Sequence, residues 1–238
     1  MPVAPPVDAP QAEPEQSGIL ELGERAPGGL SLVVLRNPET GDRVLAAMRW
    51  GLPEAEDDGK PVLYVRAETI GNRGAIREAL RRRRCIVPMD SYVQQAGPEG
   101  ATGLYAISLA DGAQMAVAAI WQDADDGPHF AIVTCRANEA VAVIHDRMPV
   151  ILPPQAWPAW LAAGLASPLE VWDLLKPCPS TMLRIRRVPG TTRRKAAPTE
   201  VGQQLELIAP GAALVDPGRQ PRRKRPERPA RSARRALG

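Results

Sequence analysis

Short apolar runs separated by turn residues dominate the first half of the chain. Leu30 to Arg36 and Arg43 to Trp50 are two such runs, rich in Val, Leu and Ala. Asn37 to Asp42 lies between them and carries the Asn, Pro and Gly of a turn. Runs of this length on either side of a turn predict two strands that pair as a hairpin.

A second pair of apolar runs surrounds an Asp-Gly dipeptide. Leu104 to Leu109 and Gln114 to Trp121 flank Ala110-Asp111-Gly112. Asp-Gly favours the tight turn that joins adjacent antiparallel strands, so the pattern predicts a second hairpin. Further strands are expected at Cys85 to Pro88, Tyr92 to Gln94, His129 to Cys135 and Met182 to Val188.

Helical spacing is confined to short segments. Ala75, Ile76, Ala79 and Leu80 recur at the spacing of one helix face, and Asn72 can cap the helix that they predict. Four arginines follow this helix. Other short helices are expected at Ala137 to Ile144, at Gln155 to Ala163, and after Ser167, where Pro168 and Glu170 complete an N-terminal capping pattern.

Strands joined by hairpins, with a few short helices between them, predict a single α+β domain with antiparallel sheets. We place that domain at residues 29–190. Residues 1–28 are rich in Pro, Ala and Glu, and we expect a flexible lead-in there. Residues 191–238 are basic and low in complexity, and we expect a disordered tail.

Charge is divided unevenly along the chain, although the formal net charge is only +3. From Arg184 onward there are 15 Lys and Arg against 4 Asp and Glu, whereas residues 1–183 hold 15 against 23. A basic end on an acidic body favours a polyanionic partner such as nucleic acid, but a solvated tail has the same composition. The run Arg81, Arg82, Arg83 and Arg84 also has two interpretations: contact with DNA, or favourable charge at the end of a helix.

Little in the composition points to a metal, a cofactor or a membrane. Cys85, Cys135 and Cys178 lack the paired spacing of a zinc site, and the first two lie in apolar runs that predict buried thiols. No apolar stretch approaches the roughly 18–20 residues of a membrane span. Phosphate-loop, dinucleotide and zinc-protease motifs are absent from the sequence. We therefore expect a cytoplasmic protein with no cofactor, no metal and no membrane partner.

The two histidines have different surroundings. His129 follows Asp-Gly-Pro at the start of an expected strand, and we expect it at the surface. His145 begins His145-Asp146-Arg147, three polar residues inside an otherwise apolar stretch. A half-buried, hydrogen-bonded histidine would explain that pattern. The local pattern alone favours this interpretation, and the alternative is a site in which His, Asp and Arg bind phosphate or sugar oxygens and move a proton.

Four segments with recognisable chemistry follow one another in order. They are Met48-Arg49-Trp50-Gly51-Leu52-Pro53, Arg66-Ala67-Glu68-Thr69, Arg83-Arg84-Cys85-Ile86-Val87-Pro88-Met89-Asp90, and the stretch from Asn138 to Leu152 that contains His145-Asp146-Arg147-Met148-Pro149. Together they resemble the SOS response-associated peptidase family over roughly residues 30–188. Each segment alone is a weak signal, but four in this order and spacing are specific.

The resemblance implies a compact, mostly β, α+β domain that protects abasic sites in single-stranded DNA. Family members use an N-terminal cysteine that forms a thiazolidine with the ring-opened sugar, and the same cysteine is thought to release the N-terminus by self-cleavage. A glutamate and the histidine of the His-Asp-Arg segment assist ring opening and proton transfer. Carried over to this chain, the resemblance makes His145 catalytic. It also implies that the DNA is contacted by Trp50, Arg66, Glu68, Asp146 and Arg147. We add the cations Arg81, Arg82, Arg83 and Arg84 to this set of expected DNA contacts.

Three positions depart from the family's pattern. Residue 2 is Pro2 where the family has cysteine, and a thiazolidine needs a thiol beside the amine. Gln94 stands where the family has the glutamate, and an amide side chain cannot exchange a proton at physiological pH. Loss of one such acid–base group typically lowers a rate about 10²–10⁴-fold. Tyr64 occupies a position at which the family has asparagine.

The sequence therefore predicts a monomeric protein that binds single-stranded or abasic-site DNA in the DNA-damage response, with its enzymatic activity impaired. Two alternatives stay open. One is an active abasic-site crosslinking enzyme and autopeptidase whose start lies upstream. The other is a protein–protein scaffold that does not bind DNA. An exposed Pro2 would also offer a secondary amine that can attack a sugar aldehyde, although the simpler interpretation is that Pro2 only begins the lead-in.

Overall fold

The computed structural model describes residues 27–37, 39–53, 60–72, 74–96, 103–162, 168–189 and 214–215. The strands in chain order are β1 (Leu30–Arg36), β2 (Arg43–Trp50), β3 (Tyr64–Arg66), β4 (Arg84–Met89), β5 (Ser91–Gln95), β6 (Leu104–Leu109), β7 (Met115–Ala124), β8 (Gly127–Arg136), β9 (Arg147–Pro149), β10 (Leu183–Val188) and β11 (Leu214–Val215). The α-helices are α1 (Gly74–Arg82), α2 (Glu139–Ala142), α3 (Trp157–Leu161) and α4 (Pro168–Leu174), and 3-10 turns are η1 (Ala67–Thr69), η2 (Pro154–Ala156) and η3 (Ser180–Met182).

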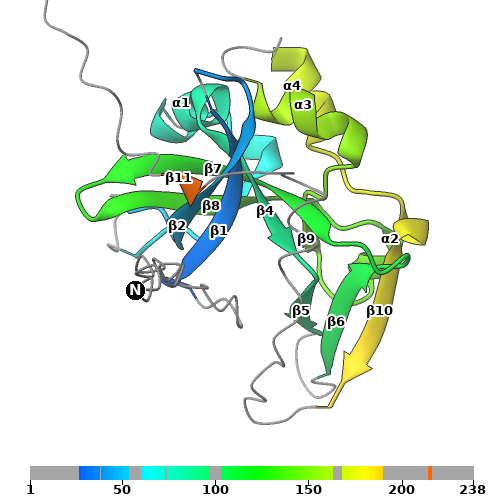
Figure 1. Cartoon of the computed structure of the whole chain (residues 1–238). Coiled ribbons are helices and arrows are strands. Elements are labelled where there is room, and N and C mark those ends of the chain that lie inside the picture. The colour runs from blue at the N-terminus through cyan, green and yellow to red at the C-terminus, as the bar shows by residue number, and fades with distance from the viewer. Residues whose placement is uncertain are drawn as a thin grey trace, which may run out of the picture.

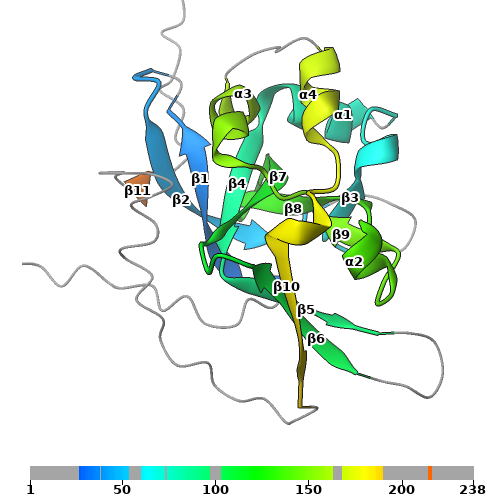
Figure 2. The same ribbon diagram turned by 90° about the vertical axis from the view of Figure 1, so that its right-hand side faces the viewer.

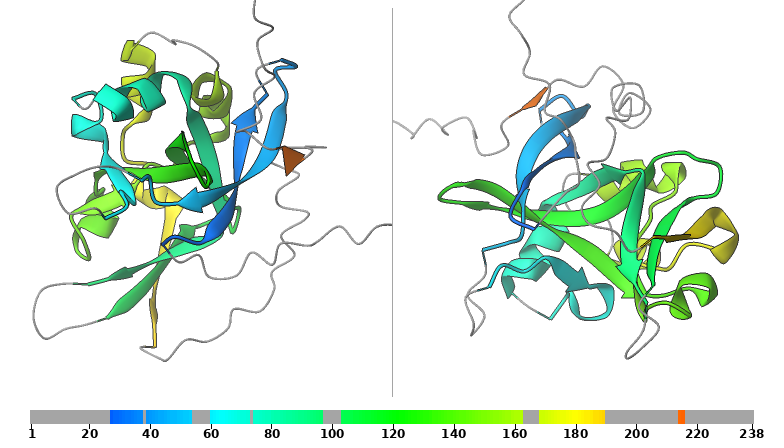
Figure 3. Two further views of the ribbon diagram at one scale, coloured as in Figure 1. Left: turned by 90° about the vertical axis from the view of Figure 1, so that its left-hand side faces the viewer. Right: turned by 90° about the horizontal axis from the view of Figure 1, so that it is seen from below.

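A ring of five strands surrounds the core (Figure 1). β1 pairs with β2 on one side and with β4 on the other, and β7 lies between β4 and β8. The ring closes where the end of β2 pairs with β8, at Arg49–His129 and Trp50–Phe130. β3 and β9 extend the sheet along the second half of β8. Helices α1, α3 and α4 gather at one end of this barrel, and a smaller sheet projects from the other end (Figure 3).

The prediction of an α+β domain with antiparallel sheets and a few short helices is confirmed. Antiparallel pairs join β1 to β2, β4 to β7 and β7 to β8. The structure adds one feature that the sequence pattern does not predict: β2 and β3 both run parallel to β8. These parallel pairs involve only two or three residue pairs each, which is too short for a periodic signal.

The predicted hairpin around Asp111-Gly112 is wrong. β6 pairs with β5 and β10 in the three-stranded sheet, whereas β7 pairs with β4 and β8 in the barrel. The first six residues of β7 are all buried, as expected for a strand covered on both faces, and β6 is only partly buried. The actual hairpin joins β7 to β8 at Asp126-Gly127, where Ala124 pairs with Gly127 and Gly127 has a φ of 115°. Both turns contain Asp-Gly, so the dipeptide alone cannot identify the paired strands.

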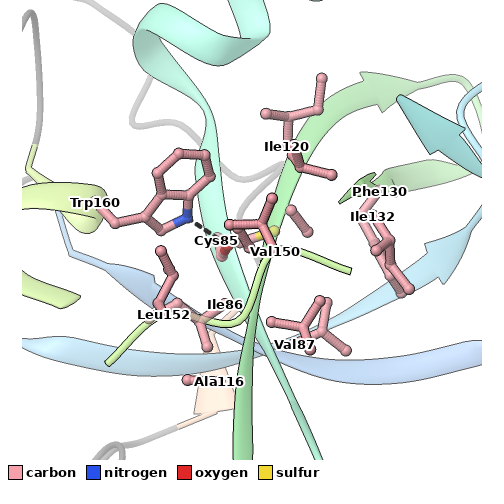
Figure 4. Packing of buried hydrophobic residues seen from close by; sticks show 14 of the residues in the cluster. Cys85, Ile86, Val87, Ala116, Ile120, Phe130, Ile132, Val150, Leu152 and Trp160 are labelled. Atoms are coloured by element: carbon pink, nitrogen blue, oxygen red, sulfur yellow. Dashed lines mark hydrogen bonds between the residues drawn. The ribbon is translucent and has the colours of Figure 1, made fainter. Parts of the chain in front are cut away.

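The barrel core continues into the layer formed by α3 (Figure 4). Trp160 is fully buried, and its indole N–H donates to the carbonyl of Cys85 on β4 at 2.8 Å. Val150 and Leu152 lie beside this pair. A fully buried large apolar side chain contributes roughly 1.5–3 kcal/mol. Trp160 therefore holds α3 against β4, and its polar atom is satisfied there.

The two ends of the chain lie mostly outside the described residues, so the lead-in and tail boundaries at 28 and 190 stay predictions. The exception is β11, two residues within the segment that we expected to be disordered. Leu214 and Val215 pair parallel with Leu45 and Ala46 of β2, and Val215 packs against the core. Apolar residues at this point of the tail cover an edge strand, which explains the local order.

The last arginine of the run, Arg84, has a structural role inside the protein. Arg84 is only 6% exposed, and its guanidinium donates to the carbonyls of Leu80 and Arg81 at the end of α1. It also donates to the carbonyls of Trp160 and Ala162 at the end of α3, at 2.5 Å each. The expectation that Arg84 contacts DNA is corrected accordingly: its charge is used to cap two helices from inside the protein.

Replacing this internal cap should destabilise the fold. Arg84→Met keeps the length of the side chain but leaves buried carbonyl oxygens without donors, so the free energy of unfolding should fall by about 3 kcal/mol. The measurement is urea denaturation followed by circular dichroism. Arg81→Met is the matched control, because Arg81 is exposed at the same helix end and should change stability by less than about 0.5 kcal/mol. Equal stability of the two variants would contradict the assignment.

Candidate functional site

An ion pair between Glu68 and Arg147 joins two distant segments of the sequence. Glu68 lies in η1 directly after β3, and Arg147 begins β9. The two guanidinium Nη atoms of Arg147 donate to the two carboxylate oxygens of Glu68, both at 2.9 Å. Bidentate pairs of this kind fix orientation as well as proximity. Figure 2 shows β3, β9 and α2 on the same side of the molecule.

Strand β8 explains why these side chains meet. Arg66 on β3 is the pairing partner of Thr134 on β8, and Arg136 on β8 is the pairing partner of Arg147 on β9. Paired residues point to one face of a sheet, and residues two apart on a strand share that face. The guanidinium of Arg147 also donates to the carbonyl of Thr134 at 2.7 Å and to its hydroxyl at 3.2 Å. A row of polar side chains therefore crosses β3, β8 and β9, and we call Arg66, Thr134, Arg136 and Arg147 the polar row.

The carboxylate of Glu68 is held in its charged form. The hydrogen bonds from the Arg147 guanidinium are the largest cause, and they lower the pKa of Glu68 below its ordinary value. Its side chain remains 41% exposed, whereas that of Arg147 is 18% exposed. The pair can therefore be reached by a ligand, while Arg147 itself is held in place by the surrounding protein.

His145 is oriented by the main chain of the same arginine. The backbone N–H of Arg147 donates to Nδ1 of His145 at 3.0 Å, which requires the tautomer that carries its proton on Nε2. If Nδ1 is protonated, it faces the carbonyl of Arg147 at 3.1 Å and the carboxylate of Asp146 at 3.3 Å. The His145 side chain is 40% exposed and that of Asp146 is 85% exposed. Either protonation state thus has partners on one edge of the ring.

Asn138 sets the direction of the loop that carries His145. Its side-chain oxygen accepts from the N–H of Val141 at the start of α2, and its amide donates to the carbonyl of Cys178 at 2.9 Å. An Asn cap of this kind stabilises a helix by about 1 kcal/mol. The backbone N–H of His145 then bonds to the carbonyl of Val141. The helix is only four residues long, so these fixed ends determine where His145 lies.

Trp50 and its neighbours hold the barrel closed. The indole N–H of Trp50 donates to the carbonyl of Leu63 at 3.1 Å, and its ring stacks on Phe130 with centroids 6.5 Å apart. Gly51 has a φ of 121°, and a Cβ there would lie 2.9 Å from Pro61. Trp50 and Gly51 therefore have packing roles in this segment, and contact of Trp50 with DNA stays a prediction. Trp50 also contacts Tyr64 on β3 edge-on, with 5.6 Å between the ring centroids, and β3 carries Arg66 of the site.

His129 corrects another expectation. It was expected at the surface, but it is 6% exposed. Its Nδ1 lies 2.7 Å from the carbonyl of Gly51, and its Nε2 lies 2.8 Å from the carboxylate of Asp126. These contacts join the β7–β8 turn to the end of β2, where Arg49 also meets Asp126 at 3.3 Å. His129 is thus part of the barrel closure.

The remaining arginines of the run lie at the end of α1. Arg82 pairs with Glu78 one helical turn earlier, at 2.7 Å. Arg83 lies over the ring of Trp121, at 5.6 Å from its centroid, and 3.9 Å from Asp123. Arg81 is exposed. DNA contact by Arg81, Arg82 and Arg83 stays a prediction, and the structure gives two of them protein partners that a ligand would have to displace.

Gln94 lies on the three-stranded sheet. Its pairing partner on β6 is Tyr105, which in turn pairs with Arg187 on β10. The side-chain amide of Gln94 donates to the carbonyl of Gln95 at 3.4 Å, a long and weak contact. Pro2 lies outside the described residues, so its expected role is a prediction only.

The cysteines do not supply a nucleophile within the described part of the chain. Burial raises the pKa of Cys135 to about 12 and that of Cys178 to about 11, and it raises the pKa of Cys85 further. Each thiol is buried and unpaired. The thiolate is the reactive form, so these residues are inert packing groups. Among the described residues, no cluster of His, Cys, Asp and Glu could hold a metal ion, and no helix is long and apolar enough to cross a membrane.

Two residues of the site were missed in the sequence. Thr134 and Arg136 lie near the end of β8, in Thr134-Cys135-Arg136, and alternate across the buried Cys135. Polar residues at the end of an otherwise apolar strand were the available signal. The pattern could not show that β3 and β9 place Arg66 and Arg147 beside them.

Comparison with known proteins relates the chain to one family and to solved structures of similar fold. The model of the family described as SOS response associated peptidase (SRAP) matches residues 12–193. Two Bacillus subtilis proteins, abasic site processing proteins YoqW and YoaM, are 33% and 34% identical over 143 residues, which is 56% of this chain. The chain covers 64% and 63% of their lengths, less than two thirds. A solved structure from Bacteroides thetaiotaomicron has a TM-score of 0.60 and 24% identity over 68% of this chain and 75% of its own, a likeness of fold.

The Glu68–Arg147 pair predicts an acid-sensitive contribution to stability. Because the folded pKa of Glu68 is lowered, the pair stabilises the protein above the ordinary glutamate value of about 4.3, and this is lost as the pH falls through the folded value. Glu68→Gln should therefore be less stable than the parent at pH 7, by less than about 1 kcal/mol because the pair is partly solvated. The difference should vanish near pH 2–3. Thermal unfolding at both pH values checks this, and a constant difference would contradict it.

Proposed function

Because the chain belongs to the SOS response-associated peptidase family, we propose that it binds single-stranded DNA at abasic sites as part of the DNA-damage response. The bidentate contact of Arg147 with Glu68 carries this proposal. It is supported by the names of the two Bacillus relatives, abasic site processing proteins. The proposed protein acts as a monomer in the cytoplasm and needs no cofactor.

The proposed binding site uses three kinds of group. Arg66 and Arg136 present exposed cations on the row that crosses β3 and β8, and these bind phosphates of the backbone. His145 offers Nε2 to a sugar oxygen, since its Nδ1 edge is already bonded to Arg147. Glu68 accepts from a sugar hydroxyl while Arg147 holds it charged. An abasic sugar suits this site because, with no base attached, its oxygens can reach the row directly.

We propose further that the covalent step of the family is impaired in this protein. Gln94 lies where the resemblance puts a glutamate, and its amide can donate and accept hydrogen bonds but cannot transfer a proton. The described cysteines are protonated and buried, so they do not replace the family's nucleophile. The site then recognises the damaged sugar and holds it without closing a stable ring on it.

Binding should depend steeply on salt and on the arginines of the row. A fluorescently labelled single strand with one abasic site is titrated at several salt concentrations. Arg66→Gln and Arg136→Gln should each weaken binding and lower the slope of log K against log salt by about 0.7–1. Arg36→Gln is the control, because Arg36 is an exposed arginine on β1 that binds the carbonyl of Gly41 within its own hairpin, and it should change neither quantity. Absence of binding by the parent protein at low salt would refute DNA binding and leave the scaffold alternative.

A denaturing gel of the same complexes tests the covalent step. After incubation with abasic single-stranded DNA, the expected result is a band shift on the native gel and none after heating in detergent. Arg147→Gln removes the guanidinium that holds Glu68 but keeps the backbone N–H that contacts His145, and it should lose the preference for abasic over intact strands. A heat-stable adduct would overturn the proposal of impaired chemistry and favour an active crosslinking enzyme.

A further inference from the structure

Tyr64 presents an aromatic ring to solvent beside the polar row. It is 52% exposed, which is unusual for so large a ring at the end of a paired strand. Its ring meets Trp50 edge-on, with centroids 5.6 Å apart and planes at 88°. Trp50 is itself fixed by its stack on Phe130 and its hydrogen bond to the carbonyl of Leu63. The exposed ring therefore rests against Trp50, which is itself held by Phe130 and by its hydrogen bond to Leu63.

The strand geometry places this ring in line with two arginines. Tyr64 and Arg66 alternate with the buried Val65, so both project from the exposed face of β3. Residues two apart on a strand are separated by about 6.6 Å, which is similar to the spacing of successive phosphates along an extended single strand. Thr134 pairs with Arg66, and Arg136 continues the same face of β8. Glu68, which lies beside this row in η1, is neutralised by Arg147.

We propose that Tyr64 is a stacking platform for an unpaired base next to the damaged sugar, with Arg66 and Arg136 holding the flanking phosphates. The inference rests on the proposed function and assigns a new contact within it. A phenol ring stacks on any base, because every base has a flat π-face. The ring stays neutral at physiological pH, since burial raises the pKa of Tyr64 above its ordinary value, and it therefore does not repel the phosphates.

The arrangement is preorganised in a way that favours DNA over a protein partner. The ring already rests against Trp50 before binding, so less side-chain freedom is lost when a base stacks on it. Cations on neighbouring positions would disfavour a purely apolar partner, but they match a strand whose phosphates alternate with bases. Tyr64 thus adds recognition of an intact neighbouring base to a site that recognises a missing one.

Three variants separate stacking from charge. Tyr64→Leu keeps an apolar side chain without a π-face and should weaken binding of an abasic-site single strand by roughly 5- to 150-fold, the range measured for stacked bases. Tyr64→Phe should bind as the parent does. Neither change should alter the slope of log K against log salt, whereas Arg136→Gln should lower that slope by about 0.7–1. Loss of binding in Tyr64→Phe as well as in Tyr64→Leu would mean that the hydroxyl, rather than the ring, makes the contact, and would overturn the proposal.

A scan of the DNA itself tests the same contact without relying on a folded variant. The strand carries one fixed, unreactive tetrahydrofuran sugar, and a second one replaces each neighbouring nucleotide in turn. At one neighbouring position, removal of the base should weaken binding by the parent protein about as much as the Tyr64→Leu substitution does. The affinity of the Tyr64→Leu variant should not fall further when the same base is removed. If every position costs both proteins equally, Tyr64 does not stack and the inference fails, while salt-dependent binding by the parent would leave the proposed function intact. No binding by the parent at all would refute both.

Discussion

The geometry of the site depends on one residue, Arg147. Its backbone N–H fixes Nδ1 of His145, its guanidinium aligns both oxygens of Glu68, and the same guanidinium bonds to the carbonyl of Thr134. The planar guanidinium, with donors in fixed directions, thus links β9 to η1 through Glu68 and to β8 through Thr134. A lysine could supply the charge but not this set of contacts, because its ammonium is a point charge on a flexible stem. Arg147 therefore keeps Glu68 charged through its side chain and positions the Nδ1 edge of His145 through its backbone.

The chemistry that this arrangement supports is recognition of an exposed sugar. An ionised carboxylate and an imidazole edge beside a row of cations can bind hydroxyls and phosphates together. What the described residues lack is a group that gains or loses a proton at the position of Gln94 and a thiol that ionises near neutral pH. We propose that binding geometry and covalent chemistry are separated in this protein, because they depend on different side chains. The exposed ring of Tyr64 fits this division, since it adds contact area and no reactivity.

The sequence pattern predicts local structure well and neighbours in space poorly. The bounds of β1, β2 and β6 agree with the apolar runs, because each run ends at turn residues. The predicted pairing of β6 with β7 is wrong because Asp-Gly occurs both in the β6–β7 connection and in the turn that joins β7 to β8. Arg84 was counted as a DNA contact because a run of four arginines does not reveal that its last member faces the carbonyl ends of two helices. His145, Glu68 and Arg147 were found together through the family resemblance, whereas Thr134 and Arg136 needed the register of β8 with its two neighbours.

The most direct test of the account is a crystal structure of the protein bound to a single strand that contains one unreactive tetrahydrofuran sugar. We expect that sugar to lie within hydrogen-bonding distance of His145 Nε2 and the Glu68 carboxylate, with the Arg147–Glu68 contact unchanged from the free protein. A strand bound along α1 or the three-stranded sheet, with the row across β3, β8 and β9 left empty, would contradict it.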